Sequence, residues 1–479
     1  MAFKKFTVGM GLVIGLLTAS APAQTLTLLH AFAPLGNGTN SDGIFPFGAL
    51  AASGGVLYGT TFNGGANSNG TVFAVNKDGT SFTNLHVFAI RGGPVHTNAD
   101  GGWPGGGVIV SGNTLYGTTG LAGPALRGTI FAMKTDGTGF TNLHVFSGGS
   151  DGSSTLAGLV LSSNRLYGAS QGGGANAYGM LFGMNTDGSA YTNLHSFPGL
   201  LNNTNSDGSQ PLAALVVAGT NLFGTCWSGG VAGLGSVFRL NTDGSGFTNL
   251  HSFTAAVSGT NSDGAMPYAG GLIVGDNVLY GTTRVGGPLG AGVLYRLNTD
   301  GSGFTNLHSF SPVNNLTNAD GALPYGNLFL SGKVLYGTAS VGGTSSNGTV
   351  FVMNNDGSGF KVLYNFTGTV NNTNREGATP VSAILSSNTL YLVAHTGGSG
   401  GNGALGSLWV SPALSLNLAG GKAVLAWLTN ADGFTLQSSS DLSTSSSWSV
   451  VGTTPVNTNG QYIITNSLSA GAVFFRLTR

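Results

Sequence analysis

The residues that could carry acid–base chemistry in this sequence are its carboxylates, and most of them recur at fixed places. The chain has 16 acidic residues. Twelve Asp residues recur in two classes of segment, each directly before Gly: six in longer segments (Asp42, Asp100, Asp151, Asp207, Asp263, Asp320) and six in short turns (Asp78, Asp136, Asp187, Asp243, Asp300, Asp356). An Asp before Gly in a turn accepts backbone hydrogen bonds. No isolated carboxylate pair stands out, as a glycosidase would need.

The histidines follow the same rule. Six of the eight occupy one repeated position, namely His30, His86, His144, His195, His251 and His308, and Tyr364 takes that position in a seventh copy. A residue that recurs in every repeat is expected to have the same role in each of them. For these histidines we expect a structural role with hydrogen bonds. Only His96 and His395 fall outside it. No Gly-x-Ser-x-Gly turn supports a Ser-His-Asp site, and we predict no catalytic residue.

Two loops have a weak likeness to calcium loops. Residues 203–208 and 96–101 place oxygen-bearing side chains on alternate positions before Gly. The acidic residue expected later in such a loop is absent, and Leu316 or Gly259 takes the first ligand position elsewhere. We expect no metal or other cofactor, with calcium kept as the alternative. Cys226 is the single cysteine, which excludes an internal disulfide and favours a buried apolar role.

Composition limits the classes of partner. Only 7% of the residues are charged and the formal net charge is zero, so nucleic acid has no basic surface to bind. Residues 1–23 read as a signal peptide, with Lys4 and Lys5, an apolar run, and Ala21-Pro22-Ala23 before Gln24. We expect a secreted or cell-surface protein, with an uncleaved anchor as the alternative. No later segment is long and apolar enough for a membrane helix.

The elements that must position any site come from a repeat. Leu57-Tyr58-Gly59 returns six times, the last copy degraded to Leu390-Tyr391-Leu392, at steps of 58, 51, 56, 57, 56 and 55 residues. Each unit divides into four apolar runs separated by turn residues, which in the first unit are 48–52, 56–61, 71–76 and 82–88. Four antiparallel strands per unit of about 50 residues predict the blades of a β-propeller.

The ends of the array predict a closed ring. The final unit stops after its third strand at 407–410, and the missing fourth strand appears at the other end as residues 28–32. An N-terminal strand that completes the last blade removes exposed sheet edges. The chain is therefore predicted to be all-β: a seven-bladed propeller over residues 24–411, then a small β-sandwich over 412–479, where Ser and Thr replace the repeat.

These pieces resemble the GloVer tandem repeats of secreted bacterial proteins, in which Leu-Tyr-Gly-Thr-Thr, Gly-Gly, Gly-x-Val-Phe, Asp-Gly and Leu-His-x-Phe follow in order. The resemblance covers residues 26–410. It implies the fold and export, and no reaction. Members of the family differ in C-terminal anchoring segments, and no apolar helix with a basic tail is evident in this chain.

The residues that do not repeat are the candidates for binding. In a four-stranded blade the loops from strand two to three and from blade to blade emerge on one face, which we name the long-loop face. It holds Arg91, His96, Trp103, Arg127, Gln171, Trp227, Arg284 and His395. Trp stacks on sugars and apolar surfaces, and Arg supplies fixed donors. Two hypotheses follow: a non-catalytic extracellular protein that binds a glycan or protein, or a lyase or hydrolase acting on polysaccharide. Packing between blades is the alternative role of Trp103 and Trp227.

Overall fold

The structure is a computed structural model that describes residues 3–8, 12–17, 24–93, 96–268, 270–410, 414–419, 422–428, 434–440, 448–458, 461–467 and 471–478. All regular elements in these ranges are β-strands. No helix long and apolar enough to cross a membrane occurs among them. The chain divides into a larger unit, residues 26–384 and 391–407, and a smaller unit, residues 1–25, 385–390 and 408–479.

Seven antiparallel sheets follow one another in the larger unit. Sheet 1 contains β4 (Ile44–Ser53), β5 (Val56–Asn63), β6 (Thr71–Asn76) and β7 (Thr83–Val87), paired in that order. Sheets 2 to 5 repeat this strand order. Sheet 2 contains β8 (Val108–Ser111), β9 (Thr114–Thr119), β10 (Thr129–Lys134) and β11 (Thr141–Val145), and sheet 3 contains β12 (Val160–Ser162), β13 (Arg165–Ser170), β14 (Met180–Asn185) and β15 (Thr192–Ser196). Sheet 4 contains β16 (Val216–Ala218), β17 (Asn221–Cys226), β18 (Ser236–Asn241) and β19 (Thr248–Ser252), and sheet 5 contains β20 (Ile273–Gly275), β21 (Val278–Thr283), β22 (Val293–Asn298) and β23 (Thr305–Ser309).

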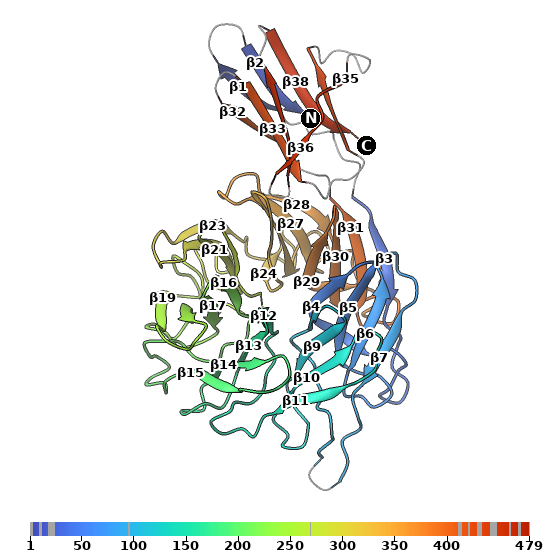
Figure 1. Ribbon diagram of the computed structural model, residues 1–479, viewed down its shortest axis with the longest axis vertical. Coiled ribbons are helices and arrows are strands. Elements are labelled where there is room, and N and C mark those ends of the chain that lie inside the picture. Colours follow the sequence, from blue (N-terminus) through green and yellow to red (C-terminus); the bar gives the residue numbers. More distant parts are fainter. Residues whose placement is uncertain are drawn as a thin grey trace. The chain divides into compact units, whose positions relative to one another are not determined.

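Sheets 6 and 7 vary the plan. In sheet 6 the first strand is split into β24 (Ala322–Pro324) and β25 (Phe329–Ser331), which both pair with β26 (Val334–Val341), followed by β27 (Thr349–Asn354) and β28 (Lys361–Asn365). Sheet 7 contains β29 (Ala378–Ser386), β30 (Thr389–Thr396), β31 (Ala404–Trp409) and, as its fourth strand, β3 (Leu26–Ala31). The N-terminal strand thus completes the last sheet, as the offset in the repeat predicts. Figure 1 shows the first strands of the sheets nearest a common centre and β3 beside β31.

Packing inside each sheet explains the recurring Leu-Tyr-Gly. A Cβ added to Gly59 would lie 2.5 Å from the Phe73 ring on the next strand, so the large aromatic requires the glycine opposite. In sheet 7 the small and the large residue of this pair change places. By position in the repeat, buried Leu392 replaces the Gly and Gly406 replaces the Phe. The degraded copy of the motif is therefore a volume-conserving swap, which cores tolerate best.

Histidine and Asp join neighbouring sheets at six seams. At each seam the His Nε2 lies 2.8 to 3.3 Å from an Asp carboxylate, in the pairs His30–Asp42, His86–Asp100, His144–Asp151, His195–Asp207, His251–Asp263 and His308–Asp320. Each ring also stacks on an aromatic ring of the following sheet, with centroids 3.7 to 4.0 Å apart. The repeated residues are structural, as expected from their recurrence.

The seventh seam uses a different set. Tyr364 donates its hydroxyl to Glu376 at 2.7 Å. The aromatic partner of the other seams is replaced by Leu26, the first residue of β3. All three residue types thus change together at the one seam where the N-terminal strand meets sheet 6.

A backbone hydrogen bond links every sheet to the one before it. The residue two positions after the Asp-Gly or Glu-Gly pair has φ between 52° and 59° and donates its N–H to a carbonyl of the preceding sheet at 2.8 to 3.1 Å. The pairs are Phe45 to Asn402, Trp103 to Asn69, Ser154 to Arg127, Gln210 to Tyr178, Met266 to Leu234, Leu323 to Ala291 and Thr379 to Asn347. A left-handed backbone at a non-glycine residue costs free energy. The bond to Asn402 links sheet 7 to sheet 1.

Acid should weaken the seams in two steps. Burial lowers the pKa of His144 and His195 from 6.5 and outweighs the paired Asp, whose charge and hydrogen bond raise the pKa of each ring. Burial alone would raise the pKa of Asp263 and Asp320, but hydrogen bonds, first from His251 and His308, lower it from 3.8. Groups with a depressed folded-state pKa contribute stability that is present above the unfolded pKa and lost as pH falls.

We therefore expect the melting temperature to be flat above about pH 6.5, to decline below it as His144 and His195 bind protons, and to fall again below about pH 4. Scanning calorimetry across this range measures both steps. Replacing both His144 and His195 with Asn should reduce the first step, to which buried His395 also contributes, and leave the second. A first step that is undiminished by this double replacement would contradict the assignment.

The smaller unit contains two sheets. One has the order β32 (Ser415–Ala419), β33 (Lys422–Leu428), β37 (Gln461–Ser467), β36 (Val456–Thr458). The other has β1 (Phe3–Val8), β2 (Leu12–Leu17), β38 (Gly471–Thr478), β34 (Thr435–Ser439) and β35 (Ser449–Val450). Buried Leu425, Trp427 and Ile464 of the first sheet share a core with Leu436 and Phe475 of the second. Strands β1 and β2 lie within the predicted signal peptide, whose cleavage stays a prediction.

Candidate functional site

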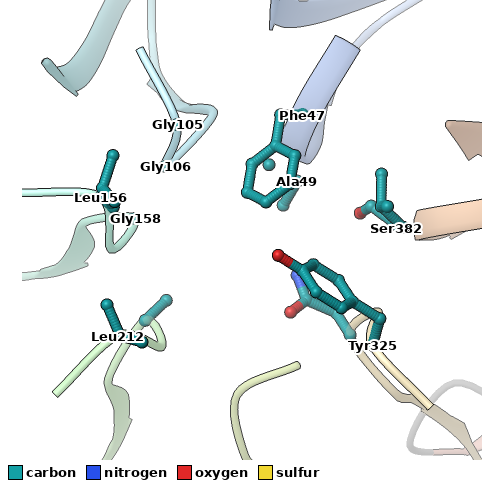
Figure 2. A pocket seen from close by; sticks show the side chains of 13 residues that line it. Phe47, Ala49, Gly105, Gly106, Leu156, Gly158, Leu212, Tyr325 and Ser382 are labelled. Carbon is teal, nitrogen blue, oxygen red and sulfur yellow. The ribbon is translucent and has the colours of Figure 1, made fainter. Parts of the chain in front are cut away.

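The first strands of the sheets surround an axial cavity. Each first strand is entered through a segment of the form Asp-Gly-x-x-Pro or Glu-Gly-x-x-Pro, with Thr in place of the Pro in sheet 3. The next residue differs from sheet to sheet, and in chain order it is Phe47, Gly105, Leu156, Leu212, Tyr268, Tyr325 and Val381. Six of these seven, all but Tyr268, line a cavity of about 40 Å³ together with smaller residues one or two positions further along. Figure 2 shows side chains from different sheets around one central space, with the Tyr325 hydroxyl directed into it.

Close backbone contacts explain the small residues beside the cavity. A Cβ added to Gly106 would lie 2.5 Å from the carbonyl oxygen of Ala157, and one on Gly48 would lie 2.3 Å from the amide of Gly107. The first strands of neighbouring sheets therefore approach backbone to backbone. Larger residues at these places would push the sheets apart and open the centre.

Six half-buried rings contact one another in succession at the cavity. Their order is Trp103, Phe62, Phe47, Tyr325, Tyr268 and Trp227, and we name this series the aromatic arc. Successive ring centroids are 4.8 to 6.4 Å apart. Phe47 and Tyr325 belong both to the arc and to the cavity wall, so the arc and the cavity form one site.

Cationic and imidazole groups lie on the arc. The Arg91 guanidinium is 5.4 Å from the centroid of Trp103, and that of Arg284 is 5.4 Å from the centroid of Tyr268. The His395 ring packs against Phe47 with centroids 5.4 Å apart. Burial lowers the pKa of His395, which keeps this ring neutral near pH 7. The arc thus offers apolar ring faces with a guanidinium near each end.

The structure brings together five of the eight candidate residues: Arg91, Trp103, Trp227, Arg284 and His395. His96 is exposed and lines, with Arg91 and Ile90, an open cleft of about 430 Å³ beside the arc. Arg127 and Gln171 lie outside the arc, at the seam between sheets 2 and 3. There the carbonyl of Arg127 accepts a hydrogen bond from Ser154 N, and Gln171 N donates to Ser154 O.

Sequence reasoning missed Phe47, Phe62, Tyr268 and Tyr325. It looked for residues outside the repeat, whereas Phe47, Tyr268 and Tyr325 occupy a repeated position at which the residue type varies. A signal was present, because this position directly follows the Pro that enters each first strand. When the residue type at one repeated position near the axis varies from sheet to sheet, the side chains at that position are expected to make different contacts.

The acidic side chains have structural partners. Asp78 accepts hydrogen bonds from the amide and hydroxyl of Thr80, and the five equivalent turn Asp residues do the same with Thr or Ser two positions on. These bonds lower the pKa of Asp78. With the seam carboxylates, every acidic residue described in the larger unit is paired in this way except Asp276. Within the described residues, none of the arc members is a carboxylate.

The loops with a likeness to calcium sites are held by protein hydrogen bonds. Asn205 accepts from Gly208 N and Gly230 N, and donates to the carbonyls of Pro198 and Gly208, at 2.8 to 3.1 Å. Asn98 makes the same four bonds in the other loop. A calcium ion would have to displace these bonds to use the amide oxygen.

We therefore expect excess chelator to leave the thermal melting temperature nearly unchanged. The measurement is a melting curve with chelator, without it, and after calcium is restored. A large loss of stability that calcium reverses would show that these loops hold the ion. Magnesium in place of calcium is the matched control.

The sheet order and the axial site define a propeller-like repeat protein. The chain belongs to the Gloeobacter/Verrucomicrobia repeat family, which matches residues 7–202, 199–311 and 254–462. This confirms the resemblance in the repeat motifs. No curated protein matches the chain.

Three solved structures are distantly similar. An oligogalacturonate lyase in complex with manganese has 11% identity and a TM-score of 0.48, over 86% of this chain and 96% of that one. The GH74 enzyme of Niastella koreensis has 15% identity and a TM-score of 0.47, over 85% and 59%. A chain of a nidogen/laminin complex has 13% identity and a TM-score of 0.35, over 59% and 84%. These likenesses are too distant to bear on function.

Proposed function

We propose that the larger unit is a closed seven-bladed β-propeller, that the smaller unit is a β-sandwich, and that the chain is exported after removal of residues 1–23. Seven sheets of the same plan, the place of β3 in sheet 7, and the hydrogen bond from Phe45 to Asn402 support the closed ring. The core shared by two sheets supports the sandwich. The basic and apolar order of residues 4–17 supports export.

We propose that the exported propeller is a non-catalytic binding protein whose ligand is a glycan. The aromatic arc is the observation that carries this proposal. Half-buried Trp, Tyr and Phe rings present apolar faces on which sugar rings stack, and the side chains lose little conformational entropy on binding. Arg91 and Arg284 supply donors for sugar hydroxyls near the two ends of the arc.

The chemistry of the arc favours binding over sugar hydrolysis. Sugar hydrolysis requires a carboxylate acid and a second carboxylate as base or nucleophile. The described acidic side chains of the larger unit, except that of Asp276, bond to turns or seams, and none of them belongs to the arc. The arc instead combines neutral rings, guanidinium groups and an imidazole.

Glycan arrays together with a product assay test the proposal. We expect the purified protein to bind a defined set of oligosaccharides and to leave polysaccharides intact over prolonged incubation, as detected by reducing ends and unsaturated products. Turnover of any bound polysaccharide would establish the enzyme alternative. A protein that binds no array glycan but captures a protein ligand on the long-loop face would show that the ligand class is wrong.

A further inference from the structure

The axial cavity has a composition of its own within the site. Its walls are mainly apolar, with Phe47, Leu156, Leu212 and Val381 among them. Its polar groups are few, and they include the Tyr325 phenol and the side chains of Asn327 and Ser382. No side chain that is charged at neutral pH lines it. A group that enters the cavity must therefore be largely apolar and uncharged, because an unpaired charge there would lose its hydration.

One polar group in the cavity has no partner. The Ser382 side chain is 1% exposed and its hydroxyl has no hydrogen bond. Figure 2 shows Ser382 at the edge of the central space, with its oxygen on the cavity side. A buried hydroxyl without a partner costs free energy. An acceptor placed in the cavity would satisfy it.

The volume limits the size of the group. At about 40 Å³, the cavity has room for about three water-sized groups. An acetyl group has three non-hydrogen atoms, of which the methyl carbon suits the apolar walls and the carbonyl oxygen accepts a hydrogen bond. A hydroxymethyl group has two non-hydrogen atoms, so it would leave part of the apolar space of the cavity unfilled. A carboxylate carries a charge that no cavity residue balances.

We propose that the axial cavity binds the acetyl group of an acetylated sugar whose ring stacks on Phe47 and Tyr325 of the aromatic arc. This inference rests on the proposed glycan-binding function and specifies its ligand. The methyl lies among the apolar side chains, and the carbonyl oxygen accepts the hydrogen bond of the Ser382 hydroxyl. The acetyl group reaches the sugar through nitrogen or through oxygen, and both linkages share this chemistry.

Titration calorimetry with matched oligosaccharides separates the contribution of the acetyl group to affinity from that of the sugar backbone. Chitotetraose carries N-acetyl groups on the same backbone as cellotetraose, and O-acetylated xylotetraose is paired with xylotetraose. We expect at least one acetylated sugar to bind about tenfold more tightly than its partner, and the two pairs distinguish the linkages. Equal affinities within both pairs would overturn the acetyl site and leave glycan binding intact. Absence of binding to all four would overturn the acetyl site, and glycan binding as well if no glycan on the array were bound.

Two variants locate the effect. Ser382→Ala removes the hydroxyl and should abolish most of the preference for the acetylated sugar, without lowering the melting temperature, because the hydroxyl has no partner to lose. Ala214→Leu, at a cavity-lining residue, narrows the cavity and should remove the preference, and a melting curve checks that the sheets still pack normally. Ser53→Ala, at the exposed end of β4, is the matched control and should change neither. A preference that survives both Ser382→Ala and Ala214→Leu would place acetyl recognition elsewhere.

Discussion

A variant that lacks residues 24–33 is expected to melt at a sharply lower temperature than the parent protein or to aggregate. The deletion removes β3 and with it the fourth strand of sheet 7. It also removes Leu29 and Phe32, which are 8% and 0% exposed and belong to the core shared by sheets 1 and 7. The edge of β31 would then lie open, and an unpaired edge strand promotes association with other chains.

A single substitution tests the same seam with less disruption. Phe32→Ala should cost about 3–5 kcal/mol, or roughly 10 °C in melting temperature. Thr27→Ala, on the exposed side of the same strand, should change little. Light scattering during the melt shows whether aggregation accompanies the loss. If the deletion variant melted like its parent, the larger unit would not depend on closure by β3.

Replacing Tyr325 with Ala is expected to weaken glycan binding by about a hundredfold or more, the largest effect of any single change in the site. Tyr325 contacts Phe47 and Tyr268 in the arc and also forms part of the cavity wall. Its removal therefore interrupts the stacking surface at the centre. Trp103→Ala, Trp227→Ala and Arg91→Ala, further from the centre, should each weaken binding about tenfold.

Controls on other surfaces separate binding from folding. Lys134→Ala and Lys333→Ala, both at exposed residues of the short hairpins, should leave affinity unchanged. Trp409→Ala removes a partly exposed Trp outside the arc and controls for the loss of an aromatic residue. Calorimetric affinities and melting curves on the same samples are the readout. Sensitivity of the hairpin variants with a silent arc would move the site to the opposite face.

Much of the fold was predictable because glycine and turn residues punctuate each repeat. In the first unit the expected strands 56–61 and 71–76 correspond to β5 and β6 within two residues. The first strand was harder to predict, since β4 begins at Ile44, four residues early, and sheet 6 splits its first strand in two. Both differences occur where the chain approaches the axis. There the strand pairing is determined by backbone contacts between sheets rather than by the alternation of side chains.

The site was predictable in part. Trp, Arg and His residues outside the repeat identified five groups in or beside the arc, because bulky residues in a Gly-, Ser- and Thr-rich surface need a specific environment. Phe47 and Tyr325 could not be placed from sequence, since they belong to sheets 1 and 6 and no sequence pattern shows that the two rings meet.

The place of β3 also sets the order in which the molecule can acquire its structure. The Asn402 side chain donates to the carbonyl of Ala33 across 369 residues of chain. Sheets 1 to 6 form from neighbouring segments, whereas sheet 7 requires β3, which is made early, to pair with β31, which is made late. Contacts of such large separation form slowly. Refolding should therefore end with one slow phase in which the chain termini of the ring associate, and sheet 7 should be the last to gain protection from hydrogen exchange.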